Sequence, residues 1–128
     1  MPTENKRFSI VKRAKSFSHA WRGIGIFLRT THNSWIQIFA CIIVVILGFY
    51  FEISSFEWLA LIFSSGLVFV SEAFNTAIEI DMDLTSPEFH PFARDTKDVA
   101  AGAVLLSAIT SFVIGIIIFL PHIIFLFG

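Results

Sequence analysis

Residues Glu72 to Asp83 read Glu-Ala-Phe-Asn-Thr-Ala-Ile-Glu-Ile-Asp-Met-Asp, and this stretch continues an apolar run with no proline or glycine inside it. The simplest interpretation is one helix that becomes acidic as it reaches a membrane surface. At about 100° per residue, five polar side chains share one face of this helix: Glu72, Asn75, Thr76, Glu79 and Asp83. Carboxylates at membrane depth are costly and need a partner, a metal ion or a water-filled pocket. The stripe is therefore the first candidate for a functional site.

The composition around this stretch is that of a membrane protein. The chain has 128 residues, of which 55% are apolar and 16 are Phe. This length allows a single small domain, residues 1–128, with a few spanning helices. The net charge of -1 gives no electrostatic reason to expect nucleic acid as a partner. The single Cys41 excludes a disulfide within the chain.

Three apolar runs predict three transmembrane helices, at residues 35–51, 58–84 and 97–120. Pro87 and Pro91 lie in the polar connection at residues 85–96, where they are expected to stop the second helix and set up the third. Pro121 is expected to end or kink the third helix. The predicted fold is all-α, an integral membrane bundle of three transmembrane helices preceded by a surface helix.

The surface helix is predicted at residues 6–33, where apolar and aromatic residues recur at spacings of four and three. Its basic residues near lipid headgroups are Lys6, Arg7, Lys12, Arg13 and Lys15. An equally simple interpretation of these charges is a general positively charged anchor on the cytoplasmic side.

The basic residues also predict the orientation in the membrane. All nine Lys and Arg residues lie in residues 6–29 or at Arg94 and Lys97. By the positive-inside rule, the N-terminus and the 85–96 connection face the cytoplasm and the C-terminus lies outside. The acidic stripe is then on the side of the membrane where nucleotides are.

These residue types suit phosphoryl transfer at a membrane surface. Glu72 is deep and poorly solvated, which suits a general base, and the more exposed Glu79 suits Mg²⁺. Lys97 can stabilise the negative charge that develops on a phosphate. A proton relay uses the same kinds of residue, and the chain has no phosphate-binding loop of a known pattern.

Several of these residues also have structural interpretations. Asp98 can complete a helix cap if Asp95 is the N-cap residue. Asn75 can bond a neighbouring helix, and His90 can be a solvated loop residue.

The order of the motifs resembles that of the prokaryotic diacylglycerol kinase family, which includes the undecaprenol kinases. The matching elements are the E-x-x-N-x-x-x-E pattern from Glu72 to Glu79, then Asp83, His90, and Lys97-Asp98 followed by a run of small residues. Trp21-Arg22-Gly23 on the surface helix extends the similarity over nearly the whole chain.

This resemblance implies a homotrimeric kinase of the bacterial inner membrane that moves the γ-phosphoryl group of MgATP onto a lipid hydroxyl, with each site built from more than one subunit. By position, Glu72 matches the proton acceptor and Glu79 a metal ligand. Asn75 matches the amide of the motif. The residues that match positions near the nucleotide are Lys12, Glu88, His90, Lys97 and Asp98, with Asp83 in a supporting place.

One position departs from the family pattern. Many relatives have a second metal-binding glutamate ten residues after the Trp that Trp21 matches, whereas this chain has Thr31, followed by His32. A hydroxyl is a poorer Mg²⁺ ligand than a carboxylate. We expect weaker metal binding, a ligand role for His32 or a water, or a changed substrate balance.

The function expected from the sequence is therefore ATP-dependent phosphorylation of diacylglycerol to phosphatidic acid. The close alternative is the same reaction on undecaprenol, a long isoprenoid alcohol. A more distant alternative is a membrane scaffold or proton relay without enzymatic activity.

Overall fold

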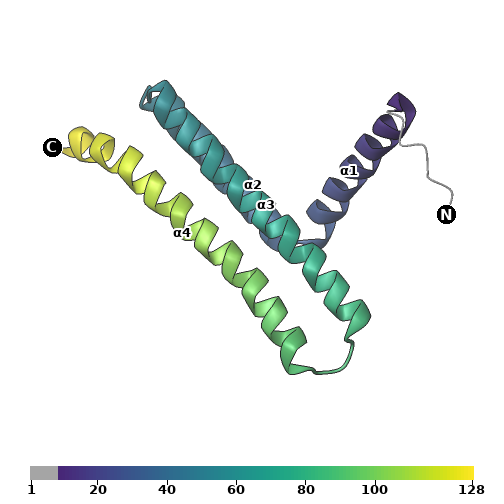
Figure 1. The fold of residues 1–128 in the computed structure, drawn as a ribbon. Coiled ribbons are helices and arrows are strands. Elements are labelled where there is room, and N and C mark those ends of the chain that lie inside the picture. The colour runs from purple at the N-terminus through teal and green to yellow at the C-terminus, as the bar shows by residue number, and fades with distance from the viewer. Residues whose placement is uncertain (1–8) are drawn as a thin grey trace.

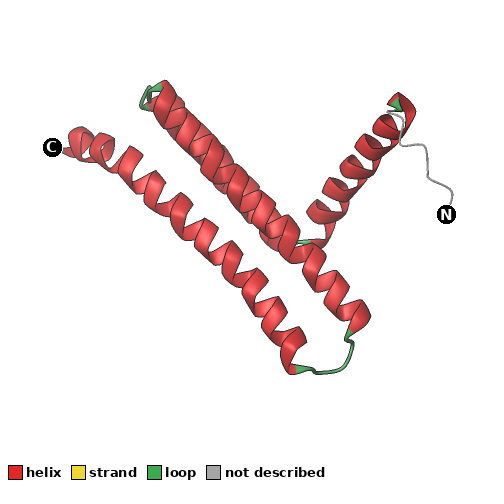
Figure 2. Ribbon diagram, in the orientation of Figure 1, coloured by secondary structure: helices red, strands yellow, loops and turns green. Residues whose placement is uncertain are grey.

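The structure is a computed structural model that describes residues 9–128, with only the backbone described for His32. Lys6 and Arg7 of the predicted surface helix lie outside the described residues. The described part of the chain contains helices and no strands: α1 (Ile10–Thr30), α2 (His32–Tyr50), α3 (Ser55–Thr85) and α4 (Pro91–Phe127). Short loops connect them (Figure 2). The expected all-α fold is confirmed.

Three of these helices, α2, α3 and α4, are long and apolar enough to cross a membrane. The 31 residues of α3 span about 46 Å at about 1.5 Å per residue, which exceeds the roughly 30 Å of a bilayer core. One end of α3 must therefore extend beyond the hydrocarbon. The end with Glu79 and Asp83 carries the charged side chains of this half of the helix, so it is the end expected to lie in water.

Local capping explains why two helices begin earlier than predicted. At the start of α3, Ser54 Oγ accepts a hydrogen bond from the Glu57 backbone N–H at 3.2 Å, and Glu57 Oε1 accepts one from the Ser54 N–H at 3.0 Å. This reciprocal capping box starts the helix at Ser55. In α4, Pro91 occupies the first turn and His90 Nδ1 accepts from the Phe92 N–H at 3.2 Å. The cap of α4 is thus His90, and the expectation that Asp95 caps this helix is wrong.

Pro121 does not end α4, which continues to Phe127. A proline inside a helix removes its own N–H donor and leaves the carbonyl four residues earlier, here that of Ile117, without a helical partner. The apolar residues after Pro121 continue the helical pattern.

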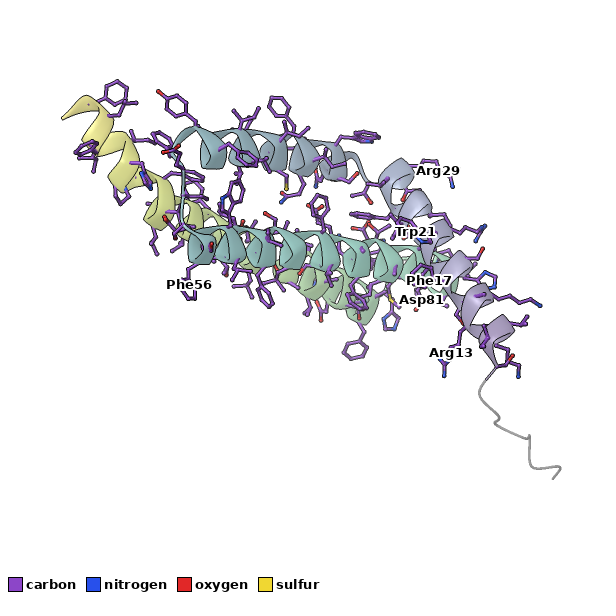
Figure 3. The ribbon with its side chains drawn as sticks, turned by 90° about the horizontal axis from the view of Figure 1, so that it is seen from above. Arg13, Phe17, Trp21, Arg29, Phe56 and Asp81 are labelled. Carbon is purple, nitrogen blue, oxygen red and sulfur yellow. The ribbon has the colours of Figure 1, made fainter. Side chains whose placement is uncertain are left out.

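The helices form a hairpin with two further helices on one side of it. Figure 1 shows α3 and α4 running antiparallel, joined by the loop between Thr85 and Pro91, with α2 along α3. α1 turns away from α2 at Thr31, whose backbone is extended at φ -107° and ψ 105°. Figure 3 shows Trp21 on the side of α1 nearer the other helices and Arg29 directed away from them.

The apolar core lies at the end of the hairpin that is far from the acidic stretch. Its buried residues are Ile53, Leu61, Ile118 and Phe119. Gly48 of α2 faces the ring of Trp58 so closely that a Cβ added there would lie 2.4 Å from Cη2 of the ring. The absence of a side chain at Gly48 therefore allows α2 and α3 to approach.

Polar side chains join α3 to α4 at three levels. Ser111 Oγ donates to Ser64 Oγ at 3.5 Å, and the hydroxyls of Ser71 and Ser107 lie 2.7 Å apart. Near the loop, Lys97 Nζ donates to Asp83 Oδ1 in an ion pair. These contacts set the register of the two helices.

Candidate functional site

The acidic half of α3 borders a polar cavity of about 390 Å³, which we call the carboxylate cavity. It lies between this half of α3 and the junction of α1 with α2. Its lining residues are Thr30, Thr31, Asn33, Asn75, Thr76, Glu79, Ile80 and Asp83. Four of the five residues predicted to share one face of the helix, all except Glu72, therefore meet around one space.

Two hydrogen bonds organise this cavity. Asn75 Nδ2 donates to Glu79 Oε1 at 3.3 Å, across one turn of the same helix. The hydroxyls of Thr31 and Thr76 lie 2.7 Å apart and join the α1–α2 junction to α3. Within the single chain, Asn75 thus bonds a residue of its own helix, and a bond to a neighbouring helix stays a prediction.

The second polar space, which we call the loop cavity, has a volume of about 250 Å³ and lies where α3, the loop and α4 meet. Its lining residues are Asp83, Ser86, Pro87, Glu88, Phe89, His90, Ala93, Arg94 and Lys97. Asp83 borders both cavities, and its ion pair with Lys97 is on the boundary. Glu88 and His90 of the loop therefore line a cavity that shares Asp83 with the carboxylate cavity.

Glu72 lies outside both cavities. Only 7% of its surface is exposed, and its Oε2 atom is buried without a hydrogen-bond partner in the single chain. A buried carboxylate oxygen without a partner is costly, so a water, a substrate group or a second protein chain would stabilise it. Glu79 is seven positions after Glu72 in α3, which places the two about 10 Å apart along the helix axis.

Two predicted site residues are not brought together with the others. Lys12, on α1, and Asp98, on α4, are exposed and line neither cavity. Because His90 caps α4, the structural interpretation of Asp98 as part of a cap with Asp95 loses its basis. His32 is described by its backbone alone, so its suggested ligand role stays a prediction.

The donor atoms of the carboxylate cavity fit a divalent cation that arrives with a phosphate. Among the described residues, no group of three or more His, Cys, Asp or Glu side chains could hold a metal ion. Mg²⁺ commonly takes only one or two carboxylates and fills its other positions with water and substrate phosphates. Glu79 offers one carboxylate. Beside it, Asn75 Oδ1 is a buried oxygen without a partner, which is the kind of atom that a bound ion or its water would satisfy.

An apolar cavity of about 450 Å³ adjoins the carboxylate cavity. It lies between α1 and α3, and its lining residues are Gly23, Ile24, Ile26, Phe27, Val70, Ala73, Phe74, Thr76, Ala77 and Ile80. Thr76 and Ile80 line both spaces. An apolar chain held in this cavity would therefore have its end beside the polar groups.

Sequence reasoning did not find the apolar cavity or the partner of Thr31. The sequence predicts Thr76 on the acidic face of the helix, but its hydroxyl pairs with Thr31, 45 positions earlier in the chain. The pairing depends on the break between α1 and α2, for which the sequence carries only weak signals, a cluster of Thr, His, Asn and Ser residues.

Comparison with known proteins finds relatives whose names describe lipid kinases. The family description "Prokaryotic diacylglycerol kinase" matches residues 18–119. The chain is 41% identical to a protein of Bacillus subtilis (strain 168) named undecaprenol kinase, over 94% of this chain and 98% of that one. It is 36% identical to a diacylglycerol kinase of Synechocystis sp., over 83% of this chain and 61% of that one. The diacylglycerol kinase of Escherichia coli (strain K12) is 23% identical, over 92% and 97% of the two chains.

Proposed function

Because this chain belongs to the prokaryotic diacylglycerol kinase family and is a membrane lipid kinase, we propose that it transfers the γ-phosphoryl group of MgATP to the hydroxyl of a membrane lipid alcohol. The observation that carries this proposal is the shared wall of two unlike cavities. Thr76 and Ile80 border both the apolar cavity and the carboxylate cavity. This arrangement suits a reaction between an oily acceptor and a charged donor.

Glu72 is the proposed general base. Its carboxylate accepts the proton of the lipid hydroxyl while the alcohol oxygen attacks the γ-phosphorus, the bond from that phosphorus to the β–γ bridging oxygen breaks, and ADP leaves. A lipid alcohol ionises far above neutral pH, so most of the rate enhancement must come from positioning and from electrostatic stabilisation of the transferred group. The burial of Glu72 keeps water away from this proton transfer.

Glu79 is the proposed ligand of Mg²⁺, with Asn75 orienting its carboxylate through the 3.3 Å hydrogen bond. A bound Mg²⁺ ion would neutralise charge on the phosphate oxygens. The carboxylate of Glu79 and the free oxygen of Asn75 are the atoms of this chain that would hold it. Thr31 supplies a hydroxyl where the family pattern has a second carboxylate.

The loop cavity is the proposed nucleotide side of the site. Lys97 lies at its edge with an ammonium group already oriented by Asp83, and it suits the stabilisation of phosphate charge. Glu88 and His90 line the same cavity and can meet the base or ribose. Lys12 and Asp98 are exposed in the single chain, and we assign them to the nucleotide only in the assembled enzyme.

A homotrimer with shared sites is part of this proposal. Glu72 has a buried oxygen without a partner, and it lines neither polar cavity of its own chain. A second copy that packs against α3 can complete the site around the base, which is the usual way in which small membrane bundles cover polar groups. The whole of residues 1–128 then acts as one domain of a larger assembly.

The proposed location is the inner membrane, with the N-terminus and both polar cavities on the cytoplasmic side. Every Lys and Arg residue of α1 precedes the first spanning helix, and Arg94 and Lys97 line the loop cavity. The distribution of positive charge favours this orientation, with the C-terminus outside.

Two acceptors follow from the names of the relatives. The 41% identity over almost the full length of both chains favours undecaprenol as the first to test, and diacylglycerol is the second. Purified protein in mixed micelles is expected to consume ATP only when one of these lipids is added. ATP consumption that is independent of every lipid alcohol would contradict the proposal, and the faster acceptor identifies the substrate.

A further inference from the structure

Two serine hydroxyls meet between α3 and α4 at the position just before Glu72. Ser71 Oγ and Ser107 Oγ lie 2.7 Å apart, and only 7% of the surface of Ser107 is exposed. Ser107 Oγ also donates to the Ala103 carbonyl at 2.9 Å. A hydroxyl carries one hydrogen, so the arrangement that satisfies all three oxygens has Ser71 donating to Ser107.

No hydrogen bond of the described residues holds the Glu72 side chain itself, and its Oε2 atom is buried without a partner. The location of this carboxylate is therefore set by the backbone of α3. That backbone is attached to α4 on both sides of the acidic stretch, by Ser71–Ser107 at one end and by the Asp83–Lys97 ion pair at the other. Ser71 is the attachment nearer to Glu72, at a distance of one residue.

We propose that Ser71 and Ser107 form a positioning pair, which fixes α3 against α4 at the level of Glu72 and so determines where the base meets the lipid hydroxyl. This inference rests on the proposed role of Glu72 as the base. Neither serine touches the reacting groups. Their effect is transmitted through the backbone of α3, because Ser71 directly precedes Glu72.

The expected consequence is a defect in the chemical step with nucleotide binding intact. Hydrogen bonds between membrane helices are individually modest, so loss of one should let α3 shift without unfolding the bundle. A small misplacement of a reacting group can lower the rate by as much as about 100-fold. We expect Ser107→Ala and Ser71→Ala to lower kcat by about tenfold and to leave KM for MgATP within about twofold. The KM should change little because the proposed nucleotide site is the loop cavity, which neither serine lines.

The chain offers a matched control on the same two helices. Ser111 Oγ donates to Ser64 Oγ at 3.5 Å, and Ser64 Oγ donates to the Leu61 carbonyl at 3.2 Å. This second pair has the same chemistry but lies seven residues, or about 10 Å along α3, farther from the base. Ser111→Ala therefore removes a similar contact and should leave kcat unchanged.

The experiment measures kcat and KM for MgATP on the detergent-solubilised full-length enzyme, with thermal unfolding as the check on folding. Ser71→Thr keeps a hydroxyl at a partly exposed position and is expected to retain the wild-type kcat. An unchanged kcat in both alanine variants would overturn the positioning pair. A loss in Ser111→Ala as large as that in Ser107→Ala would overturn it too, as would a Ser71→Thr variant as slow as Ser71→Ala.

Glu72→Gln separates failure of this inference from failure of the proposed function. If Glu72→Gln retains activity, the assignment of the base is wrong. If Glu72→Gln is inactive while Ser107→Ala and Ser71→Ala turn over normally, only the positioning pair is wrong.

Discussion

The hydroxyl of Thr31, at the junction of α1 and α2, lies 2.7 Å from the hydroxyl of Thr76 on α3. This contact joins two residues that line the carboxylate cavity. The chain therefore has a neutral link between helices at the position where the resemblance to the family leads us to expect a carboxylate. The remaining carboxylates of the cavity are Glu79 and Asp83, and Asp83 is already paired with Lys97.

Restoring that charge should strengthen binding of the metal–nucleotide complex. In Thr31→Glu, a second carboxylate would enter the carboxylate cavity and offer Mg²⁺ a better ligand than a hydroxyl. We expect the affinity for a non-hydrolysable MgATP analogue to rise by about tenfold, equivalent to about 1.4 kcal/mol. Isothermal titration of the purified protein measures this directly. Thr31→Gln has the same shape without the charge and should show no gain, and equal affinity in Thr31→Glu and wild type would show that the missing carboxylate does not matter.

Glu79 should govern the magnesium requirement of the reaction. Glu79→Gln keeps the hydrogen bond from Asn75 possible but removes the charge, so the Mg²⁺ concentration for half-maximal activity should rise by at least about tenfold. The measurement is activity as a function of Mg²⁺ at fixed ATP. Asp81, which lines neither polar cavity, offers the control: Asp81→Asn should leave the curve in place. An unshifted curve for Glu79→Gln would remove Glu79 from the metal site.

Lys97 should matter for activity far more than for folding. Its ion pair with Asp83 is largely exposed, and exposed ion pairs contribute about 0–1 kcal/mol to stability. Lys97→Met removes the cation proposed to stabilise phosphate charge and should lower kcat/KM for MgATP by about 100-fold or more. The thermal midpoint should stay within a few degrees. A large loss of stability with normal kinetics in the surviving protein would assign Lys97 to structure.

The shared site can be tested by mixing subunits. Glu72→Gln and Lys97→Met chains should each form assemblies with little or no activity. If one site takes its base and its cation from different copies, mixed assemblies contain some sites with neither defect, and activity should reappear when the two variants are unfolded and refolded together. Recovery should depend on the mixing ratio. Complete absence of recovery, with assembly confirmed by cross-linking, would place both residues of each site on one chain.

Gly48 should be required for the packing of α2 on α3. A methyl group at this position would lie 2.4 Å from the ring of Trp58, so the ring or the helix must move. Gly48→Ala is expected to destabilise the protein by about 1–3 kcal/mol, as overpacking usually does. Thermal unfolding in detergent measures the change. Gly66→Ala is the comparison, since a Cβ at Gly66 meets nothing within 4 Å, and an equal loss in both variants would contradict the steric explanation.

The sequence predicts the helical architecture well because the responsible signals are local. Apolar runs identify α2, α3 and α4, and the 3.6-residue period places Asn75, Glu79 and Asp83 on one face of α3. Helix ends are less predictable. α4 begins at Pro91 because the imidazole of His90 caps it, and a histidine cap is not a strong sequence signal.

The contacts between helices could not be predicted, since they depend on how far apart distant segments lie. The pairs Thr31–Thr76 and Ser71–Ser107 join residues 45 and 36 positions apart. Each serine or threonine by itself is an ordinary residue of a membrane helix. The separation of Glu72 from the carboxylate cavity likewise follows from its depth and burial, which the angular position on a helix does not contain.

In the proposed reaction, the intramembrane carboxylate of Glu72 removes the proton of a lipid hydroxyl as ATP donates its terminal phosphoryl group. The most direct measurement is transfer of radiolabel from γ-labelled ATP to extracted lipid, comparing wild type with Glu72→Gln in mixed micelles that contain undecaprenol or diacylglycerol. We expect labelled lipid from the wild type and a signal at background from Glu72→Gln, with both proteins assembled alike. Labelled lipid from Glu72→Gln at a rate near that of the wild type would contradict the account.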